Sequence, residues 1–154
     1  RTLAGTDDVA QLSTKVFDLR EYDPDESQTI GTATVRFAPT RHYIPCWAIR
    51  VSGSDGGSVV YTADNGDAAR LVPFAIGADV LVGEASMPAP PADQSAFRGV
   101  STAGEVARLA RDAGVGTLVL THIWSEYDGE AARARAAAVF SGRIEVARPG
   151  LVVE

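Results

Sequence analysis

The alternation of helix and strand signals after residue 64 constrains the fold of this chain more than any other feature. Two runs, DVLVG at 79–83 and TLVLT at 117–121, are apolar without interruption, as in strands that are buried on both faces. Between them, Thr102 and Glu105 form a T-x-x-E capping box, and Gly114 ends the helix that the box begins. A β-rich half followed by this alternation predicts an α/β fold, a mixed sheet with helices packed on it.

Weaker signals complete the prediction. Asp67 can cap a helix that runs to Phe74, that Pro73 should kink or shorten, and that Gly77 should end. Asp128 can cap a further helix, up to residue 138. Alternating or apolar runs bounded by turn residues predict strands elsewhere. These strands are expected at 16–22, 32–37, 44–51, 58–62, 144–147 and 151–153, and the segment 5–14 is expected to be a short helix or a loop.

Length and composition fit a single soluble domain over residues 1–154, with 45% hydrophobic and 22% charged residues. The first residue is Arg1, so we expect the chain to be part of a longer protein. The abundance of Ala, Gly and Arg with a single lysine is typical of a high-GC bacterial coding sequence. No apolar run approaches the ~20 residues of a membrane span, and a lone cysteine, Cys46, fits a reducing cytoplasm. Any metal must therefore be held by histidine and carboxylate.

The chain has two histidines, and both lie at the edge of an apolar strand. His122 follows TLVLT, Asp64 follows SVVYT, and His42 precedes IPCWAIRV in a proline-bounded turn. Imidazole and carboxylate are ligands of divalent transition metals. From the residues alone, each histidine could as well be a hydrogen-bonded boundary residue, and Asp64 could be a turn former or a helix cap.

Four ordered blocks carry a family resemblance: RHYIPCWAIRV, SVVYTADNG, ADVLVGEAS and STAGEVARLARDAGVGTLVLTH. In order and spacing they resemble the second half of the metallo-β-lactamase-fold hydrolases, particularly the ribonuclease Z-like and phosphodiesterase-like branch. The resemblance covers the chain from about residue 35 to its end. It implies an αββα sandwich of which 1–154 is the C-terminal portion. The H-x-H-x-D-H segment, which supplies further ligands in that family, is absent from this sequence.

The resemblance also implies roles for individual residues. His42 would bind the second metal, Asp64 would bridge the two metals, and His122 would be the final ligand. Glu84 resembles an acidic residue that supports a metal-binding histidine, and a carboxylate that caps the following loop is the alternative. The chain differs from the usual residues of the family at Ala63, Asn65 and Val100, where glycine, threonine and, in ribonuclease Z-like members, histidine are common.

The activity that this resemblance implies is hydrolysis of phosphodiester or similar ester bonds through a metal-bound hydroxide, with two zinc ions, or manganese, in a complete site. A hydrolase of the same fold acting on a lactone, thioester or β-lactam is one alternative, and a non-catalytic scaffold or interaction domain is another. Trp124 and Tyr127 would line the substrate pocket or simply cover the sheet edge. Expected partners are a small-molecule or phosphodiester substrate and either a second copy or the missing N-terminal segment. A net charge of −6 does not favour nucleic acid.

Overall fold

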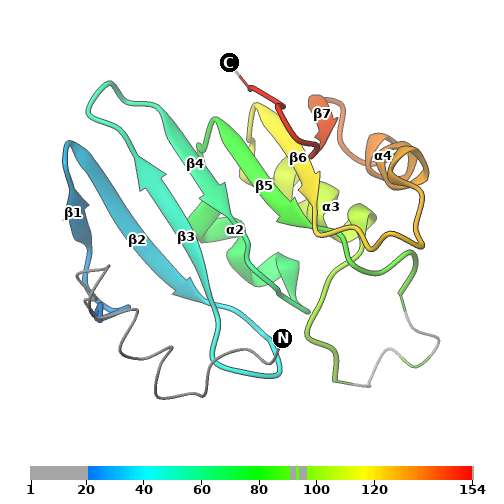
Figure 1. The fold of residues 1–154 in the computed structure, drawn as a ribbon, viewed down its shortest axis with the longest axis horizontal. Coiled ribbons are helices and arrows are strands. Elements are labelled where there is room, and N and C mark those ends of the chain that lie inside the picture. Colours follow the sequence, from blue (N-terminus) through cyan, green and yellow to red (C-terminus); the bar gives the residue numbers. More distant parts are fainter. Residues whose placement is uncertain (1–20, 91–92, 94–96, 154) are drawn as a thin grey trace, which may run out of the picture.

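A computed structural model of the chain describes residues 21–90, 93 and 97–153. This part of the chain forms a seven-stranded sheet whose spatial order is the order in sequence (Figure 1). Strands β1 to β4 pair antiparallel, and β4 to β7 pair parallel, so the predicted α/β class and mixed sheet are confirmed. The strands are β1 (Gln28–Ile30), β2 (Ala33–Pro39), β3 (Trp47–Ser52), β4 (Ser58–Tyr61), β5 (Val80–Glu84), β6 (Thr117–Thr121) and β7 (Arg143–Val146). The helical segments are η1 (Ala68–Leu71), α2 (Val72–Ala75), α3 (Ala103–Ala113) and α4 (Gly129–Ala137).

Two strand predictions are wrong in part or in whole. The strand predicted at 44–51 begins only at Trp47, because the residues before it close a turn in which Thr40 N donates to Cys46 O. The segment 151–153 forms no strand, since Leu151 N donates back to Arg148 O in a turn. The predictions at 5–14 and 16–20 lie outside the described residues, and positions 21 and 22 are not in a strand.

The helix signals are confirmed where the caps are local. Thr102 and Glu105 exchange the two hydrogen bonds of the capping box at the start of α3, and Gly114 ends the helix in the left-handed conformation, with φ 67°. Asp128 caps α4 through Glu130 N. Asp67, in contrast, is wrong as a side-chain cap, because it makes no cap hydrogen bond. The segment that it precedes is short, a 3₁₀ turn followed by one α-turn that includes Pro73.

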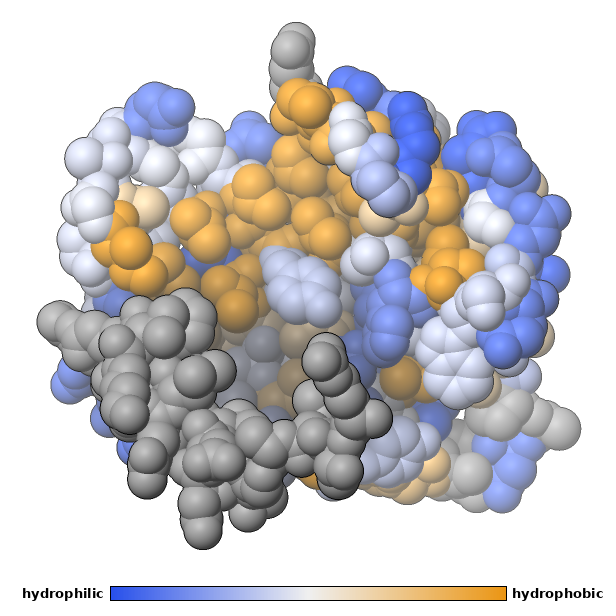
Figure 2. Space-filling model, viewed as in Figure 1, coloured by the Kyte–Doolittle hydropathy of each residue, from blue (hydrophilic) through white to orange (hydrophobic). Residues whose placement is uncertain are grey.

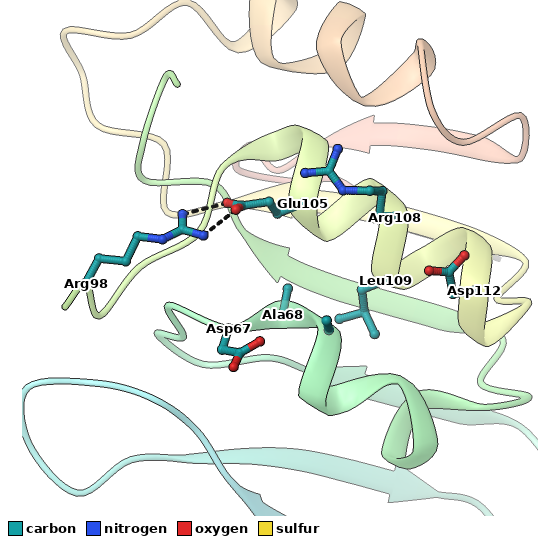
Figure 3. A pocket seen from close by; sticks show the side chains of 8 residues that line it. Asp67, Ala68, Arg98, Glu105, Arg108, Leu109 and Asp112 are labelled. Atoms are coloured by element: carbon teal, nitrogen blue, oxygen red, sulfur yellow. Dashed lines mark hydrogen bonds and ion pairs between the residues drawn. The ribbon is translucent and has the colours of Figure 1, made fainter. Parts of the chain in front are cut away.

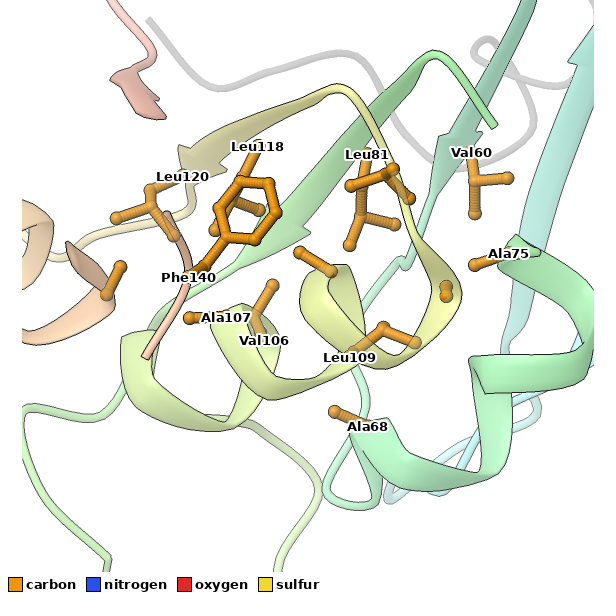
Figure 4. Close-up of a cluster of buried hydrophobic side chains, with 14 of the residues drawn as sticks. Val60, Ala68, Ala75, Leu81, Val106, Ala107, Leu109, Leu118, Leu120 and Phe140 are labelled. Carbon is orange, nitrogen blue, oxygen red and sulfur yellow. The ribbon is translucent and has the colours of Figure 1, made fainter. Parts of the chain in front are cut away.

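The hydrophobic core lies between the parallel half of the sheet and the helices (Figure 4). Leu81, Leu118 and Leu120 point from the central strands into this layer and are fully buried. They meet Val106 and Leu109 of α3, which are also buried. Successive strand residues point to opposite faces of the sheet. The helices cover one of these faces and leave the other without helices (Figure 1). No helix in the described part of the chain is long and apolar enough to cross a membrane.

The face of the sheet opposite the helices, which we call the open face, is apolar as well. The pairing register places two rows of side chains on this face, each running across neighbouring strands. Three of their members, Val51, Val59 and Tyr61, are 39%, 41% and 39% exposed. Figure 2 shows this face as a broad hydrophobic surface. The rows are Val35, Val51, Val59 and Val80, and Phe37, Ile49, Tyr61, Val82 and Val119.

Gly83 of β5 sets the distance between the sheet and α3, and it generates a first prediction. A Cβ at this position would lie 2.1 Å from Val106 Cγ1. We expect Gly83→Ala to lower the free energy of unfolding by about 1–3 kcal/mol through overpacking. The double variant with Val106→Ala should be more stable than the sum of the two single effects predicts, because the clash is gone. Chemical denaturation measures all three variants.

A matched control for this prediction is Gly104→Ala in α3. The new Cβ would meet nothing nearer than Arg108 Nη1 at 4.0 Å, so helix propensity alone should raise stability, by up to about 1 kcal/mol. Equal destabilisation by both glycine substitutions would contradict the packing argument.

Candidate metal centre

The candidate ligands meet because their strands end at one edge of the sheet. Strands β4, β5 and β6 are adjacent and parallel, so the residues that follow them lie side by side. These residues include Asp64, Glu84 and His122. Strand β2 is antiparallel to β3, which is antiparallel to β4, so β2 also ends at this edge and carries the turn that contains His42.

Asp64 lies between the two histidines. Its Oδ1 is 2.8 Å from His122 Nδ1, and its Oδ2 is 3.6 Å from His42 Nε2. The three side chains are partly exposed, His42 least and His122 most, so they remain open towards solvent. One carboxylate and two imidazoles within this distance are suitable donors for a divalent transition metal. One possible ligand atom each from Asp64, Glu84 and His122 also lie within 4.8 Å of one another.

A backbone carbonyl determines which nitrogen of His42 is free. His42 Nδ1 lies 2.7 Å from Gly99 O. A carbonyl oxygen can only accept, so Nδ1 carries the proton and the Nε2 of a neutral imidazole presents its lone pair on the side of Asp64. This tautomer is the one that a metal ligand at Nε2 requires.

His122 is held differently. Its Nδ1 contacts Asp64 and lies 3.2 Å from Ser86 Oγ. Its backbone has φ 54°, in the left-handed region that favours glycine, and Ala63 before Asp64 has φ 50°. Such conformations cost on the order of 1–3 kcal/mol each in non-glycine residues, so the surrounding packing must impose them. Glycine adopts such a conformation without strain, which explains why glycine is common in the family at the position of Ala63.

Glu84 connects the loops of the centre. The side chain is fully buried, and its carboxylate accepts hydrogen bonds from Asn65 N, Ser101 N, Ser86 N and Ser86 Oγ. These contacts bear on both roles expected for Glu84, the cap of the following loop and the support of a metal-binding histidine. It caps the following loop at Ser86, and the same hydroxyl lies between Glu84 and His122. No hydrogen bond joins Glu84 directly to a histidine within the described part of the chain.

Burial raises the pKa of the Glu84 carboxyl above its ordinary value, and the hydrogen bonds from Ser86, Asn65 and Ser101 oppose this shift. Burial also raises the pKa of Tyr61 on the open face, and the nearby charge of Asp64 adds to the shift. Burial is the main cause of both pKa shifts, and the negative charge of Asp64 adds to the shift of Tyr61.

Asn65 is the residue that sequence analysis missed. It is 2% exposed, and its side-chain Oδ1 accepts from Arg41 N and from Asp67 N. Together with the hydrogen bonds from Thr40 Oγ1 to Asp64 O and from Gly66 N to Arg41 O, it joins the two loops that carry His42 and Asp64. The sequence signal is only a turn-forming Asn-Gly pair, and the partner in the other loop, Arg41, lies 24 residues away.

The aromatic residues after His122 form a stacked pair. The rings of Trp124 and Tyr127 are 6.2 Å apart and nearly parallel, and Trp124 is 52% exposed. A second group lies beside His42, where Tyr43 contacts the imidazole and the ring of Phe97. Exposed rings of this kind can line a substrate pocket or cover the sheet edge, which are the two roles predicted for Trp124 and Tyr127.

No family model matches the chain. The probable metallo-hydrolase YhfI of Bacillus subtilis is 37% identical over 134 residues, 86% of this chain and 53% of that protein. Ribonuclease Z of Halobacterium salinarum is 39% identical over 100 residues, 64% of this chain and 32% of that protein.

A solved structure agrees with these relatives. The crystal structure of the metallo-β-lactamase-fold protein YhfI from Bacillus subtilis matches with a TM-score of 0.76 and 34% identity, over 84% of this chain and 52% of that chain. The chain belongs to the metallo-β-lactamase-fold family. The family resemblance predicted from the four sequence blocks is therefore confirmed, and the chain spans about half the length of this metallo-β-lactamase-fold relative.

The raised pKa of Glu84 generates the second prediction. A carboxyl whose pKa is raised by folding binds its proton more tightly in the folded state. Its contribution to stability is therefore present below the ordinary value of 4.5 and is lost as pH rises through the folded pKa. We expect the free energy of unfolding of the metal-free chain to fall with pH just above that value, and Glu84→Gln to remove this slope.

Urea denaturation at a series of pH values measures the slope for wild type and variant. Glu130→Gln on α4 is the matched control, because Glu130 is an exposed carboxylate 69% accessible to solvent. The control should keep the wild-type slope. A Glu84→Gln slope identical to that of wild type would exclude the proposed linkage.

Proposed function

We propose that this chain forms one half of a metal-dependent phosphodiesterase, in which His42, Asp64 and His122 are metal ligands. The observation that carries the proposal is the position of Asp64, with an imidazole nitrogen on each side at 2.8 and 3.6 Å, at the edge of a metallo-β-lactamase-fold sheet. Three ligands are fewer than a two-metal site requires. The remaining ligands would come from an upstream segment or from another chain.

The donor set of this chain fits zinc, with manganese as the alternative. His42 would bind through Nε2, since Nδ1 is engaged by Gly99 O. Asp64 offers one oxygen to each side, as a bridging carboxylate does. When bound, the metal ions would supply Lewis acidity and a water of lowered pKa. Within the chain, the Glu84 carboxylate holds the loop that carries Asp64 next to the segment before α3. Ser86 orients the His122 ring.

A phosphodiester is the substrate class that the relatives favour. Ribonuclease Z of Halobacterium salinarum is named for cleavage of RNA, which is a phosphodiester reaction. The net charge of −6 argues against an extended nucleic-acid surface on this half, so a small phosphodiester is the substrate that we propose. We also propose a bacterial, cytoplasmic protein, on the composition and the lone cysteine.

The open face supports the view that further protein covers this chain. Its two apolar rows run across five strands. The Tyr22 ring stacks on Phe37, whereas Val51, Val59 and Tyr61 remain about two-fifths exposed. Exposed apolar surface of this extent usually marks an interface. Because the chain spans about half of its relatives, we propose that the missing half of the sandwich occupies this face, rather than a second copy of the same chain.

Metal content of the full-length protein tests the proposal. We expect about two zinc or manganese ions per chain, and loss of at least one in Asp64→Ala and His122→Ala. Turnover of bis-p-nitrophenyl phosphate should fall at least ~100-fold in both variants, because ligands act directly on the reacting centre. Elemental analysis and a chromogenic assay provide the two measurements.

Glu130→Ala is the control, since this exposed carboxylate lies on α4. Absence of metal from the wild-type protein would refute the proposal of a metal-dependent enzyme and favour a scaffold or interaction domain. Metal without phosphodiesterase activity, but with turnover of a lactone, thioester or β-lactam, would replace the substrate class and keep the centre.

The isolated chain of 154 residues provides a separate prediction. Since it offers three of the ligands, we expect it to bind metal weakly and to hydrolyse bis-p-nitrophenyl phosphate at a rate close to background. Hydrolysis by this chain that is abolished by His122→Ala would show that the site is complete without further ligands.

A further inference from the structure

A short segment before α3 touches both loops that carry candidate ligands. We call residues 98–102 the strap. Gly99 O accepts from His42 Nδ1, Ser101 Oγ donates to Asn65 O, and Ser101 N donates to Glu84 Oε1. The strap therefore holds the turn of His42 and the loop of Asp64 at the same time.

The strap lies very close to the two ligand loops at Gly66 and Gly99. A Cβ at Gly66 would lie 1.9 Å from Arg98 O, and a Cβ at Gly99 would lie 2.8 Å from His42 Nδ1. Both glycines leave room for the chains to approach this closely. Because no flexible side chain intervenes at these contacts, a displacement of the strap is transmitted to the position of the His42 imidazole.

One ion pair fastens the strap to α3. The two terminal nitrogens of Arg98 donate to the two carboxylate oxygens of Glu105, with Nη1 2.7 Å from Oε2 (Figure 3). Both side chains are largely buried, 19% and 16% exposed, so this bidentate pair is better shielded than a surface pair. Glu105 is itself held at the start of the helix by Thr102 N and Thr102 Oγ1, both 2.9 Å from Oε2.

The capping box and the ion pair can be separated by mutation. Without Arg98, the hydrogen bonds between Thr102 and Glu105 remain, so the start of α3 is kept and only the end of the strap at residue 98 loses its attachment to the helix. Arg98 thus differs from Glu105, whose loss would remove the cap and the anchor together. The mixed charges of the surrounding pocket, which Figure 3 shows, include Asp67 and Arg108 but no third partner bonded to the Arg98 guanidinium among the residues drawn.

We propose that Arg98 is a positioning residue of the candidate metal centre. Through its ion pair with Glu105 it holds the strap, so that Gly99 O keeps the His42 imidazole in the Nδ1-protonated tautomer with Nε2 directed to Asp64. The inference rests on the proposed metal site for its consequence, which is tighter metal binding. Its structural part, the tautomer of His42, is independent of that site.

The test uses the full-length protein with Arg98→Met, which keeps an unbranched apolar side chain and removes the guanidinium. In the metal-free protein, ¹⁵N NMR of the imidazole reports the tautomer, and we expect loss of the single Nδ1-protonated form. Competition with a chromophoric chelator gives the zinc dissociation constant, which should rise about 10- to 100-fold, as for other residues that orient ligands. Arg98→Lys can restore one of the two hydrogen bonds and should give an intermediate value.

Arg133→Met is the matched control, because Arg133 forms an exposed ion pair with Glu130 on α4. It should leave the tautomer and the zinc affinity unchanged. If Arg98→Met unfolds the chain by leaving Glu105 buried without a partner, the double variant with Glu105→Gln removes that charge and is compared with Glu105→Gln alone.

The outcomes are distinct. A lower melting temperature with unchanged tautomer and unchanged zinc affinity would overturn the proposal and leave Arg98 a purely structural role. A wild-type protein that binds neither zinc nor manganese would refute the proposed function. In that case the NMR measurement on Arg98→Met still decides whether the strap controls His42.

Discussion

The buried carboxylate of Glu84 holds together three segments that are distant in sequence. It accepts hydrogen bonds from the loop after β4, from its own loop after β5, and from the residue before the Thr102 cap of α3. A charged group in the interior is costly unless such partners surround it, so none of these segments can move away without leaving the carboxylate unsatisfied. The candidate ligands are therefore positioned by a group that need not itself bind the metal.

The mixed topology of the sheet explains how the ligands come from such different places. In the parallel half, consecutive strands deliver their carboxyl ends to one edge, which accounts for Asp64 and His122. A turn between two antiparallel strands brings in His42. Hydrogen bonds between the loops at this edge, such as those from Gly66 N to Arg41 O and from Thr40 Oγ1 to Asp64 O, hold the centre in place.

The fold could be predicted from sequence where the signal is local. The apolar runs of β5 and β6 and the capping box of α3 specify their elements within a few residues. The cap predicted at Asp67 is wrong because its carboxylate lies beside the Arg70 side chain, 3.4 Å from Nε, and accepts no backbone N–H of the first turn. The strand predicted from residue 44 is wrong over residues 44–46, because the hydrogen bond from Thr40 N to Cys46 O places these residues in a turn.

The site was less predictable than the fold for the same physical reason. Family resemblance pointed to His42, Asp64 and His122, and the convergence of strand ends makes their proximity understandable. The hydrogen bond that orients His42, however, joins residues 57 positions apart and uses a backbone carbonyl of a glycine. No periodicity or residue type announces such a contact. Loop-to-loop contacts of this kind become visible only once the strands have set the geometry.

The left-handed backbone of His122 has a consequence for how this family can diverge. A position with φ 54° is most comfortable for glycine and asparagine, and histidine occupies it at a cost in conformational energy. A lineage released from metal chemistry would therefore drift towards those residues here, because folding itself would reward the change. If descendants of this protein kept an imidazole at this position, selection for metal chemistry would have outweighed the preference of the backbone for glycine or asparagine.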